Sequence, residues 1–92
     1  MLRSEYGRML NINSVATTVV KTGRGVLVNI VLNETNAGAI TIYDNTAASG
    51  TIIGVIAAAA PAGSNFKYEG QFTNGLTIVT AGADDITVTY GG

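Results

Sequence analysis

Carboxylates are the side chains of this sequence best suited to acid–base chemistry. The 92 residues include no His and no Cys, so the commonest general base, the thiol nucleophile and most zinc ligand sets are missing. The six carboxylates are Glu5, Glu34, Asp44, Glu69, Asp84 and Asp85. Glycoside hydrolysis needs two carboxylates about 5–10 Å apart across a cleft, whereas nearly all of these fall among turn-forming residues. The sequence therefore predicts a protein that is not an enzyme and that uses no cofactor.

Two pairs of neighbouring residues, Asp84–Asp85 and Asp44–Asn45, have the oxygen ligands that calcium prefers. They would form a site only if their two loops converged. Asp and Asn are also common in turns, because their side chains bond the nearby backbone. We therefore expect structural roles in turns for these residues and predict no metal site.

Carbohydrate binding is an alternative function, for which exposed aromatic side chains are usually needed. The chain has no Trp, and Phe66, Tyr68 and Phe72 alternate so that all three should lie on one inward face. Tyr43 remains a candidate for glycan contact, alone or with Tyr90. A tyrosine at a sheet edge or a subunit interface is the commoner case.

Short β-strands are the elements that would position these side chains. Residues 40–43 alternate between apolar and polar, a loop of turn formers follows, and a second apolar run covers residues 51–57. Further runs of this kind cover residues 15–21, 26–33, 64–72, 76–81 and 85–90. About seven or eight short strands, spaced about 8–12 residues apart with glycine at nearly every turn, predict an all-β fold, either an antiparallel β-sandwich or a jelly roll.

The first 13 residues differ from the rest of the chain. They hold both methionines and two of the five basic residues, with no sustained alternation. We expect an N-terminal arm over residues 1–13 and one β-sandwich domain over residues 14–92. The arm is interpreted either as a frayed terminus or as a segment that orders on a partner surface. The residues that would make this contact are Leu2, Tyr6, Met9 and Leu10.

Composition excludes some classes of protein and favours assembly. Only 12% of the residues are charged and 47% are hydrophobic, which is not the composition of a disordered chain. The net charge of −1, with five scattered basic residues, argues against nucleic-acid binding. No segment approaches the ~20 apolar residues of a membrane helix, and the N-terminus lacks the apolar core of a signal peptide. A small domain without disulfides or zinc is commonly stabilised by oligomerisation, so we expect assembly.

Residues 51–57 carry the most specific prediction of assembly. A regular strand would place Ile53 and Val55 on one face and Ile52 and Ile56 on the other. Such a strand is either buried on both sides or prone to aggregation. We expect one face on the core and the other against a neighbouring subunit. The predicted subunit interface consists of Ile52, Ile53, Val55 and Ile56.

Strand and turn phrases over residues 16–27, 40–56, 72–82 and 85–90 resemble a family of small β-rich virion structural proteins of tailed bacteriophages. The resemblance implies a capsid decoration (cement) protein, commonly a homotrimer, which braces neighbouring major capsid subunits from outside. Its partners would be copies of itself and the major capsid protein, with no nucleic acid and no membrane. It would be made in the host cytoplasm and would lie on the capsid exterior.

Two other roles stay open for such a protein. One is a component of the phage tail, neck or fibre, and the other is a carbohydrate-binding β-sandwich module for host attachment. The arm lies outside the resemblance, so its contact with the capsid is an expectation from its residue types alone. The residues expected to make it are Leu2, Arg3, Tyr6 and Arg8.

Overall fold

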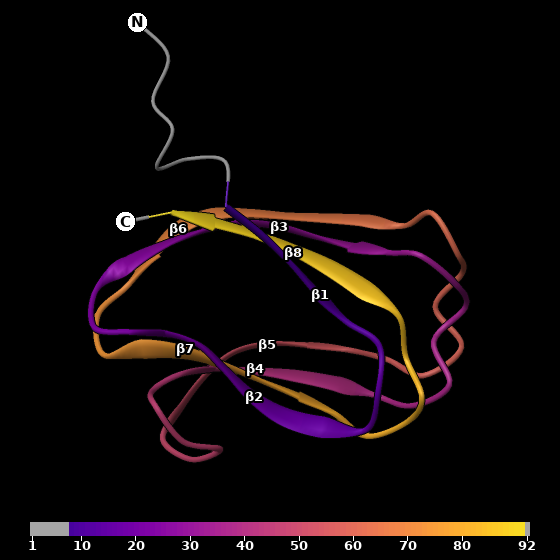
Figure 1. Cartoon of the computed structure of the whole chain (residues 1–92), viewed down its shortest axis with the longest axis horizontal. Coiled ribbons are helices and arrows are strands. Elements are labelled where there is room, and N and C mark those ends of the chain that lie inside the picture. Colours follow the sequence, from indigo (N-terminus) through magenta and orange to yellow (C-terminus); the bar gives the residue numbers. More distant parts are fainter. Residues whose placement is uncertain (1–7, 92) are drawn as a thin grey trace, which may run out of the picture.

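The computed structural model describes residues 8–91, and all regular structure in that range is β-strand (Figure 1). The strands are β1 (Arg8–Ile12), β2 (Ala16–Thr22), β3 (Gly25–Leu32), β4 (Ile40–Asp44), β5 (Thr51–Ile56), β6 (Asn65–Phe72), β7 (Gly75–Thr80) and β8 (Ile86–Gly91). No helix long and apolar enough to cross a membrane occurs in this part of the chain. The prediction of an all-β, antiparallel sandwich is confirmed.

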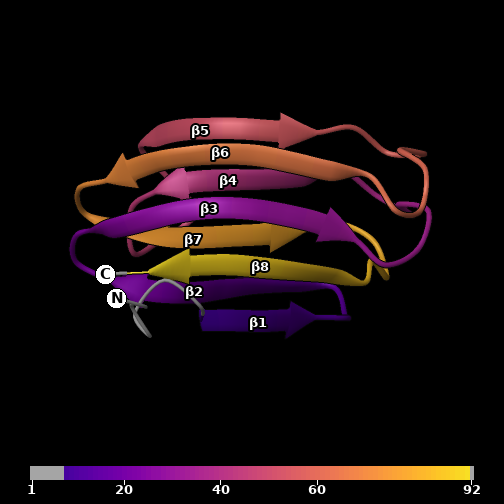
Figure 2. The ribbon, with the colours of Figure 1, turned by 90° about the horizontal axis from the view of Figure 1, so that it is seen from above.

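The strands form two four-stranded antiparallel sheets that face each other. One sheet has the order β1-β8-β3-β6, and the other has the order β2-β7-β4-β5. Figure 1 shows the sheets as two layers, and Figure 2 shows from above that β5 and β6 border one side of the sandwich while β1 and β2 border the other. Each side of the sandwich therefore has one edge strand from each sheet.

The strand pairing is nested. β1 pairs with β8, β2 with β7, β3 with β6 and β4 with β5. The outermost pair joins Arg8 to Tyr90, and the innermost joins Asp44 to Thr51. The chain is thus one long hairpin, closed by the loop over residues 45–50 and rolled into two layers. Lateral pairs between β3 and β8 and between β4 and β7 complete the sheets.

The core lies between the sheets and is built from apolar side chains on the inward side of each strand. β3 contributes Leu27, Ile30 and Leu32, and β4 contributes Ile40 and Ile42. The other members of the core are Ile12, Ile56, Phe72, Leu76, Ile78, Ile86 and Val88. All of these side chains are almost completely buried, so removing their apolar surface from water is the main contribution that holds the two layers together.

The sandwich begins earlier in the chain than the predicted boundary between arm and domain. Residues 8–12 form β1, an edge strand that pairs along its whole length with β8. Leu10 opposes Val88, and Ile12 is buried in the core. Two inward apolar positions are too few to produce a recognisable alternation, so the sequence alone does not separate β1 from the residues before it.

Asp84 joins two loops at one end of the sandwich. Its side chain is fully buried, and its Oδ1 accepts hydrogen bonds from the backbone N–H groups of Ala37 (2.7 Å) and Gly38 (3.0 Å). The backbones of Gly38 and Gly82 lie so close that a Cβ on Gly38 would be 2.5 Å from the Gly82 nitrogen. Glycine is therefore required where the β3–β4 loop meets the β7–β8 loop.

Candidate functional site

The outer face of the β2-β7-β4-β5 sheet carries two cross-strand rows of uncharged side chains. The strand register aligns Val19, Thr77, Tyr43 and Ile52 in one row, and Thr17, Val79, Thr41 and Val55 in the next. These side chains point away from the core, because their neighbours along the strands, such as Ile42 and Ile78, are buried in it. We call these eight residues the uncharged face.

Three large aliphatic side chains of the uncharged face are exposed. Val55 is 58% exposed, Ile52 52% and Val19 47%. A single exposed aliphatic side chain is normal for a soluble protein. Several on one sheet face, among threonines and a tyrosine and without a charge, are typical of a surface that contacts another protein.

A β-bulge in β5 decides which of its side chains reach this face. The register with β4 skips Ile53, which is left as an extra residue in the strand. Ile52 and Val55 therefore point outward together, whereas Ile56 is only 3% exposed and Ile53 packs against the core. The predicted facing, with Ile52 beside Ile56 and Ile53 beside Val55, is wrong because the bulge shifts the alternation by one residue. Of the four residues predicted for a subunit interface, two are on the surface and two face the core.

The β4–β5 loop borders the uncharged face at one end. The Thr77 hydroxyl donates a hydrogen bond to the Asn45 carbonyl (2.7 Å), and Thr77 is fully buried although it faces outward. The Asn45 side-chain amide in turn donates to the Ser49 carbonyl (2.9 Å), and Gly50 has a φ of 87°. These contacts give the loop a defined shape, so the uncharged face has a polar rim on that side.

The outer face of the other sheet is more polar, although it includes Met9, which is 71% exposed. The Asn29 side-chain amide donates to Asn65 Oδ1 (3.0 Å), and the Asn33 side-chain amide donates to the Thr87 hydroxyl (3.0 Å). Lys67 also lies on this face, opposite Asn29. Polar groups that are already solvated or bonded to each other gain little from burial in an interface. The contrast between the two sheets identifies the uncharged face as the candidate site.

The carboxylates of two loops bind nearby amide groups. Hydrogen bonds from the backbone N–H groups of Asn74 (2.8 Å) and Thr73 (3.0 Å) lower the pKa of Asp44. Hydrogen bonds from the side chains of Asn33 (3.0 Å) and Asn11 (2.7 Å) lower the pKa of Asp85. Both carboxylates are therefore structural, but they connect segments that are distant in the sequence, whereas the sequence predicts bonds to the nearby backbone of their own turns.

The two acidic loops that could have shared a calcium ion do not converge. Asp44 contacts the turn that precedes β7, whereas Asp84 lies beyond the end of β7. The two carboxylates are thus at opposite ends of the sheet. No group of three or more acidic side chains that could hold a metal ion occurs within residues 8–91.

The two tyrosines considered for glycan contact lie on different sheets. Tyr43 faces outward from β4, whereas Tyr90 belongs to β8 of the other sheet and packs against the core. They do not form one aromatic platform. Among the residues expected to contact a capsid, Arg8 is the first residue of β1. The remaining three, Leu2, Arg3 and Tyr6, lie outside the described residues.

Five of the eight residues of the uncharged face were not predicted as a site. They are in strands that the sequence reveals, but their common direction follows from the register between four strands. These five are Thr17, Val19, Thr41, Thr77 and Val79. A signal for this face is present in the sequence, as the mixture of threonine and valine in two of these strands. To use that signal, one would have to know that β2 pairs with β7, although more than fifty residues of chain separate the two strands.

Comparison of the chain with protein-family models, with curated proteins and with solved structures finds no match.

Proposed function

We propose that this protein is a non-enzymatic structural protein of a bacteriophage particle, and specifically a decoration protein on the capsid exterior. In this proposal it forms a homotrimer and braces neighbouring major capsid subunits, without contact to nucleic acid or membrane. The observation that carries the assembly is the uncharged face, on which Val19, Ile52 and Val55 are exposed. The phage role comes from the resemblance of the strand and turn phrases.

The uncharged face has the composition of the centre of an interface but not its full size. Complete burial of a Val or Ile side chain stabilises an association by about 1.5–3 kcal/mol, and about half of that remains to be gained for each of these three residues. A stable interface buries about 800 Å² on each partner and involves about 20–30 residues per side. The eight residues of the uncharged face would therefore be the apolar centre, with the β4–β5 loop and the backbone edge of β5 in the surrounding rim.

The edge strand β5 also supports self-association. Its sequence has no charged residue and no proline, the two devices that commonly protect an edge against pairing with another chain. The neighbouring edge strand β6 is different, because it carries Lys67 and Glu69, and Glu69 has a φ of 51°. A second copy that packs beside β5 would extend the uncharged face into the neighbouring subunit.

The topology supports a role in a virus particle. We infer that the nested pairing of the first four strands with the last four is the winding of a double-sheet jelly roll. Jelly rolls recur in viral capsid and lectin domains. On a capsid, many copies of a weak contact would act together, because each bound subunit raises the effective concentration of the next contact.

The oligomeric state tests the assembly. We expect the protein to sediment as an oligomer at about 10 µM, because the loss of exposed apolar surface favours association. Val55→Lys should give a folded monomer, since it places a charge at an outward position of the interface. Met9→Lys is the matched control, because Met9 is 71% exposed on the outer face of the other sheet. Analytical ultracentrifugation gives the mass, and circular dichroism shows whether each variant is folded.

A monomeric wild-type protein, or an oligomer that persists in Val55→Lys and dissociates in Met9→Lys, would contradict the proposed interface. Electron microscopy of the intact particle tests the location independently. Density at the local three-fold positions of the capsid is expected. Density confined to the tail or neck would overturn the decoration role while leaving the assembly through the uncharged face intact.

A further inference from the structure

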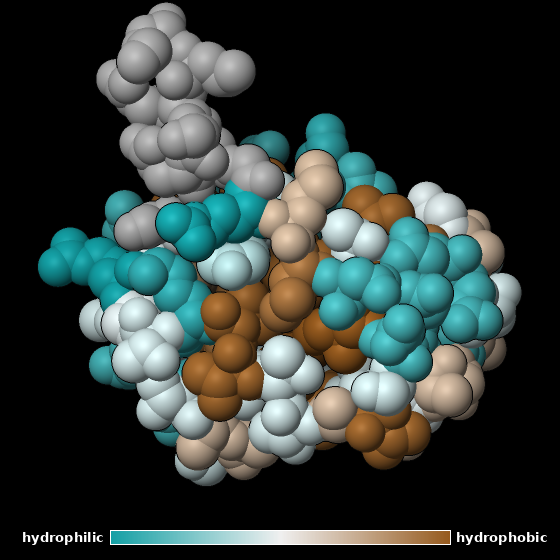
Figure 3. All heavy atoms as spheres, in the orientation of Figure 1, coloured by the Kyte–Doolittle hydropathy of each residue, from teal (hydrophilic) through white to brown (hydrophobic). Residues whose placement is uncertain are grey.

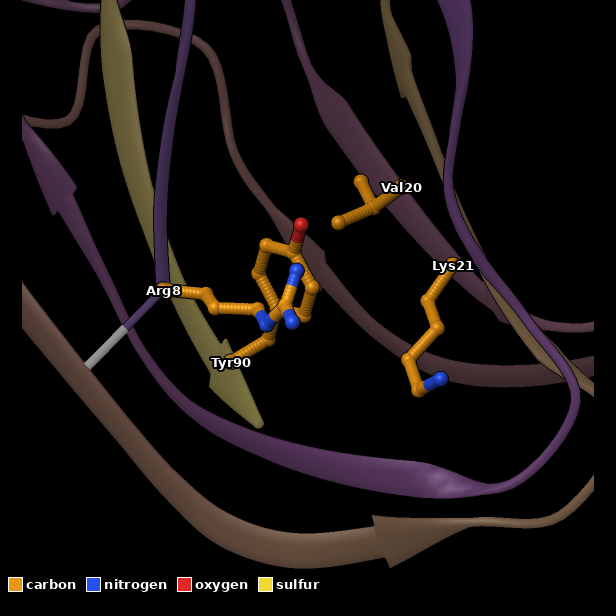
Figure 4. A pocket seen from close by; sticks show the side chains of 4 residues that line it. All are labelled: Arg8, Val20, Lys21 and Tyr90. Atoms are coloured by element: carbon orange, nitrogen blue, oxygen red, sulfur yellow. The ribbon is translucent and has the colours of Figure 1, made fainter. Parts of the chain in front are cut away.

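A pocket of about 210 Å³ opens between the two sheets, at the side of the sandwich bordered by β1 and β2. It is lined by Arg8 of β1, Tyr90 of β8, and Val20 and Lys21 of β2. Figure 4 shows the guanidinium of Arg8 and the ring of Tyr90 on one side of the pocket, and Val20 and Lys21 on the other. Each sheet therefore contributes one cationic side chain.

A β-bulge turns Lys21 toward this pocket. The register between β2 and β7 passes from Val19–Thr77 to Lys21–Leu76, which leaves Val20 as an extra residue. In a regular strand Lys21 would point outward with Val19. Because of the bulge it lies instead on the side of Leu76, which is completely buried. Bulges that redirect a side chain in this way are common beside functional sites.

Arg8 also occupies an inward position. It opposes Tyr90 in the pairing of β1 with β8, one inward position before Leu10. The stem of Lys21 lies against Gly25, where an added Cβ would be 3.0 Å from Lys21 Cδ. Two long cationic side chains thus lie at the side of the sandwich bordered by β1 and β2. They occupy inward-facing strand positions, which elsewhere in the sandwich hold apolar core residues.

Within residues 8–91, no acidic side chain of the lining balances the positive charges of the pocket. Arg8 and Lys21 are both cationic, and neither of the other two lining residues is acidic. Arg8 is exposed at the mouth of the pocket and Lys21 is half-buried, so an anion placed between them would be attracted by both charges. The Tyr90 hydroxyl supplies a further hydrogen-bond donor.

The walls of the pocket favour an anion that is attached to carbon. Val20 and the ring of Tyr90 are apolar, and Figure 3 shows hydrophobic surface along the side of the molecule where β1 and β2 lie. The volume is several times the ~30 Å³ share of one water, so it admits a group of several heavy atoms. A carboxylate matches the planar fork of an arginine. We propose that the pocket formed by Arg8, Lys21, Tyr90 and Val20 binds a carboxylate on a short hydrocarbon stem, as in a glutamate side chain or a small dicarboxylic acid.

Titration followed by amide NMR tests this site, and the test does not depend on the virion role. We expect glutarate to shift the backbone signals of Arg8, Val20, Lys21 and Tyr90 in a saturable way, with a dissociation constant on the order of 1 mM. Lys21→Gln and Arg8→Gln should each weaken binding at least about tenfold, because each removes a charge-assisted hydrogen bond. Lys67→Gln is the control, because it removes the same charge from the outer face of the β1-β8-β3-β6 sheet, away from the pocket. This variant should bind glutarate as the wild type does. The same spectra show whether each variant is folded.

Two further probes identify the chemical class and its source. The capped peptide acetyl-Gly-Glu-Gly-amide should saturate the same signals, and its Gln counterpart should not. Tighter binding of glutarate than of the peptide assigns the site to a free dicarboxylic acid, and the reverse order assigns it to an acidic residue of a protein. Shifts that do not saturate, an equal loss in Lys67→Gln, or tighter binding of inorganic phosphate than of either carboxylate would overturn the proposal.

Discussion

At the scale of single residues, the carboxylate of Asp84 connects two loops that are distant in the sequence. Its Oδ1 accepts hydrogen bonds from the N–H groups of Ala37 and Gly38, while its Oδ2 is buried without a hydrogen-bond partner among residues 8–91. One oxygen therefore satisfies two partly buried donors, which would otherwise lack an acceptor. A donor left unpaired where water has little access costs more than the net value of the hydrogen bond itself.

Asp84→Ala is expected to destabilise the protein by about 2–4 kcal/mol, because it leaves two backbone donors without an acceptor. Asp84→Asn should lower the free energy of unfolding by about half as much, since the Oδ1 of the asparagine can still accept both hydrogen bonds. Urea denaturation followed by circular dichroism gives both free energies of unfolding. Equal stability of Asp84→Ala and wild type would show that the loops do not depend on this carboxylate.

Acid should weaken the fold through Asp44 and Asp85. The pKa of each lies below the ordinary value of 3.8, because amide hydrogen bonds favour the ionised form. A carboxylate whose pKa is lower in the folded state contributes stability above the unfolded value of about 3.8, and this contribution is lost as the pH falls through the folded pKa. The free energy of unfolding should therefore decrease between about pH 5 and pH 2.

The dependence on these two groups is checked by repeating the acid titration with variants. Asp44→Asn and Asp85→Asn should each flatten the decrease, because each removes a group that binds its proton preferentially in the unfolded chain. Glu34→Gln, a change of an exposed carboxylate in the β3–β4 loop, serves as the control. An unaltered acid profile in both Asn variants would contradict the assignment.

At the scale of elements, the β3–β4 and β7–β8 loops approach each other closely at Gly38 and Gly82. A Cβ at Gly38 would lie 2.5 Å from a backbone nitrogen, which cannot move aside as a side chain can. Gly38→Ala is expected to destabilise the fold by about 1–3 kcal/mol through overpacking. Gly70→Ala is the control, because its added Cβ would be no closer than 3.6 Å to its nearest neighbour, and a change below about 0.5 kcal/mol is expected. Thermal and urea denaturation compare the two, and equal effects would contradict the prediction.

The elements also show where sequence reasoning succeeds and where it does not. The strands from β2 to β8 are recognisable because turn residues and alternating runs are local signals. The direction of Ile52 and Lys21 is not local, because the bulges at Ile53 and Val20 exist only in the register with a neighbouring strand. A period of two, continued through a bulge, assigns every later side chain to the opposite face. The half of the uncharged face on β2 and β7 is hidden for a different reason, because only the pairing of these two distant strands brings its side chains together.

At the scale of the whole molecule, the nested pairing sets an order for folding. The β4–β5 pair closes a short loop, whereas the pair of Arg8 with Tyr90 spans almost the whole described chain. Closing a longer loop loses more chain entropy, so the outer pairs are favoured only after the inner ones have formed. A topology with so many distant pairings is expected to fold on a timescale of about milliseconds to seconds.

This order predicts different kinetic effects for two core substitutions. Ile42→Val in β4 should slow folding, because its contacts form early, while Leu10→Ala in β1 should mainly speed unfolding. Stopped-flow refolding and unfolding over a range of urea concentrations separates the two rates. The prediction would be wrong if Leu10→Ala slowed folding as much as Ile42→Val does at an equal loss of stability. That result would show that the outer strands pair early in folding.

The nested pairing has one more consequence, which concerns circular permutation. Because the first and last strands are neighbours, a short linker could join them while the chain is cut in the loop over residues 45–50. The permuted chain would begin with β5 and end with β4, and its first four strands would again pair in mirrored order with its last four. The architecture is thus unchanged by the cut, but β8 and β1 become the central hairpin and β4 and β5 the outermost pair. In such a permutant the order in which the strand pairs form would be reversed, although the native contacts would stay the same.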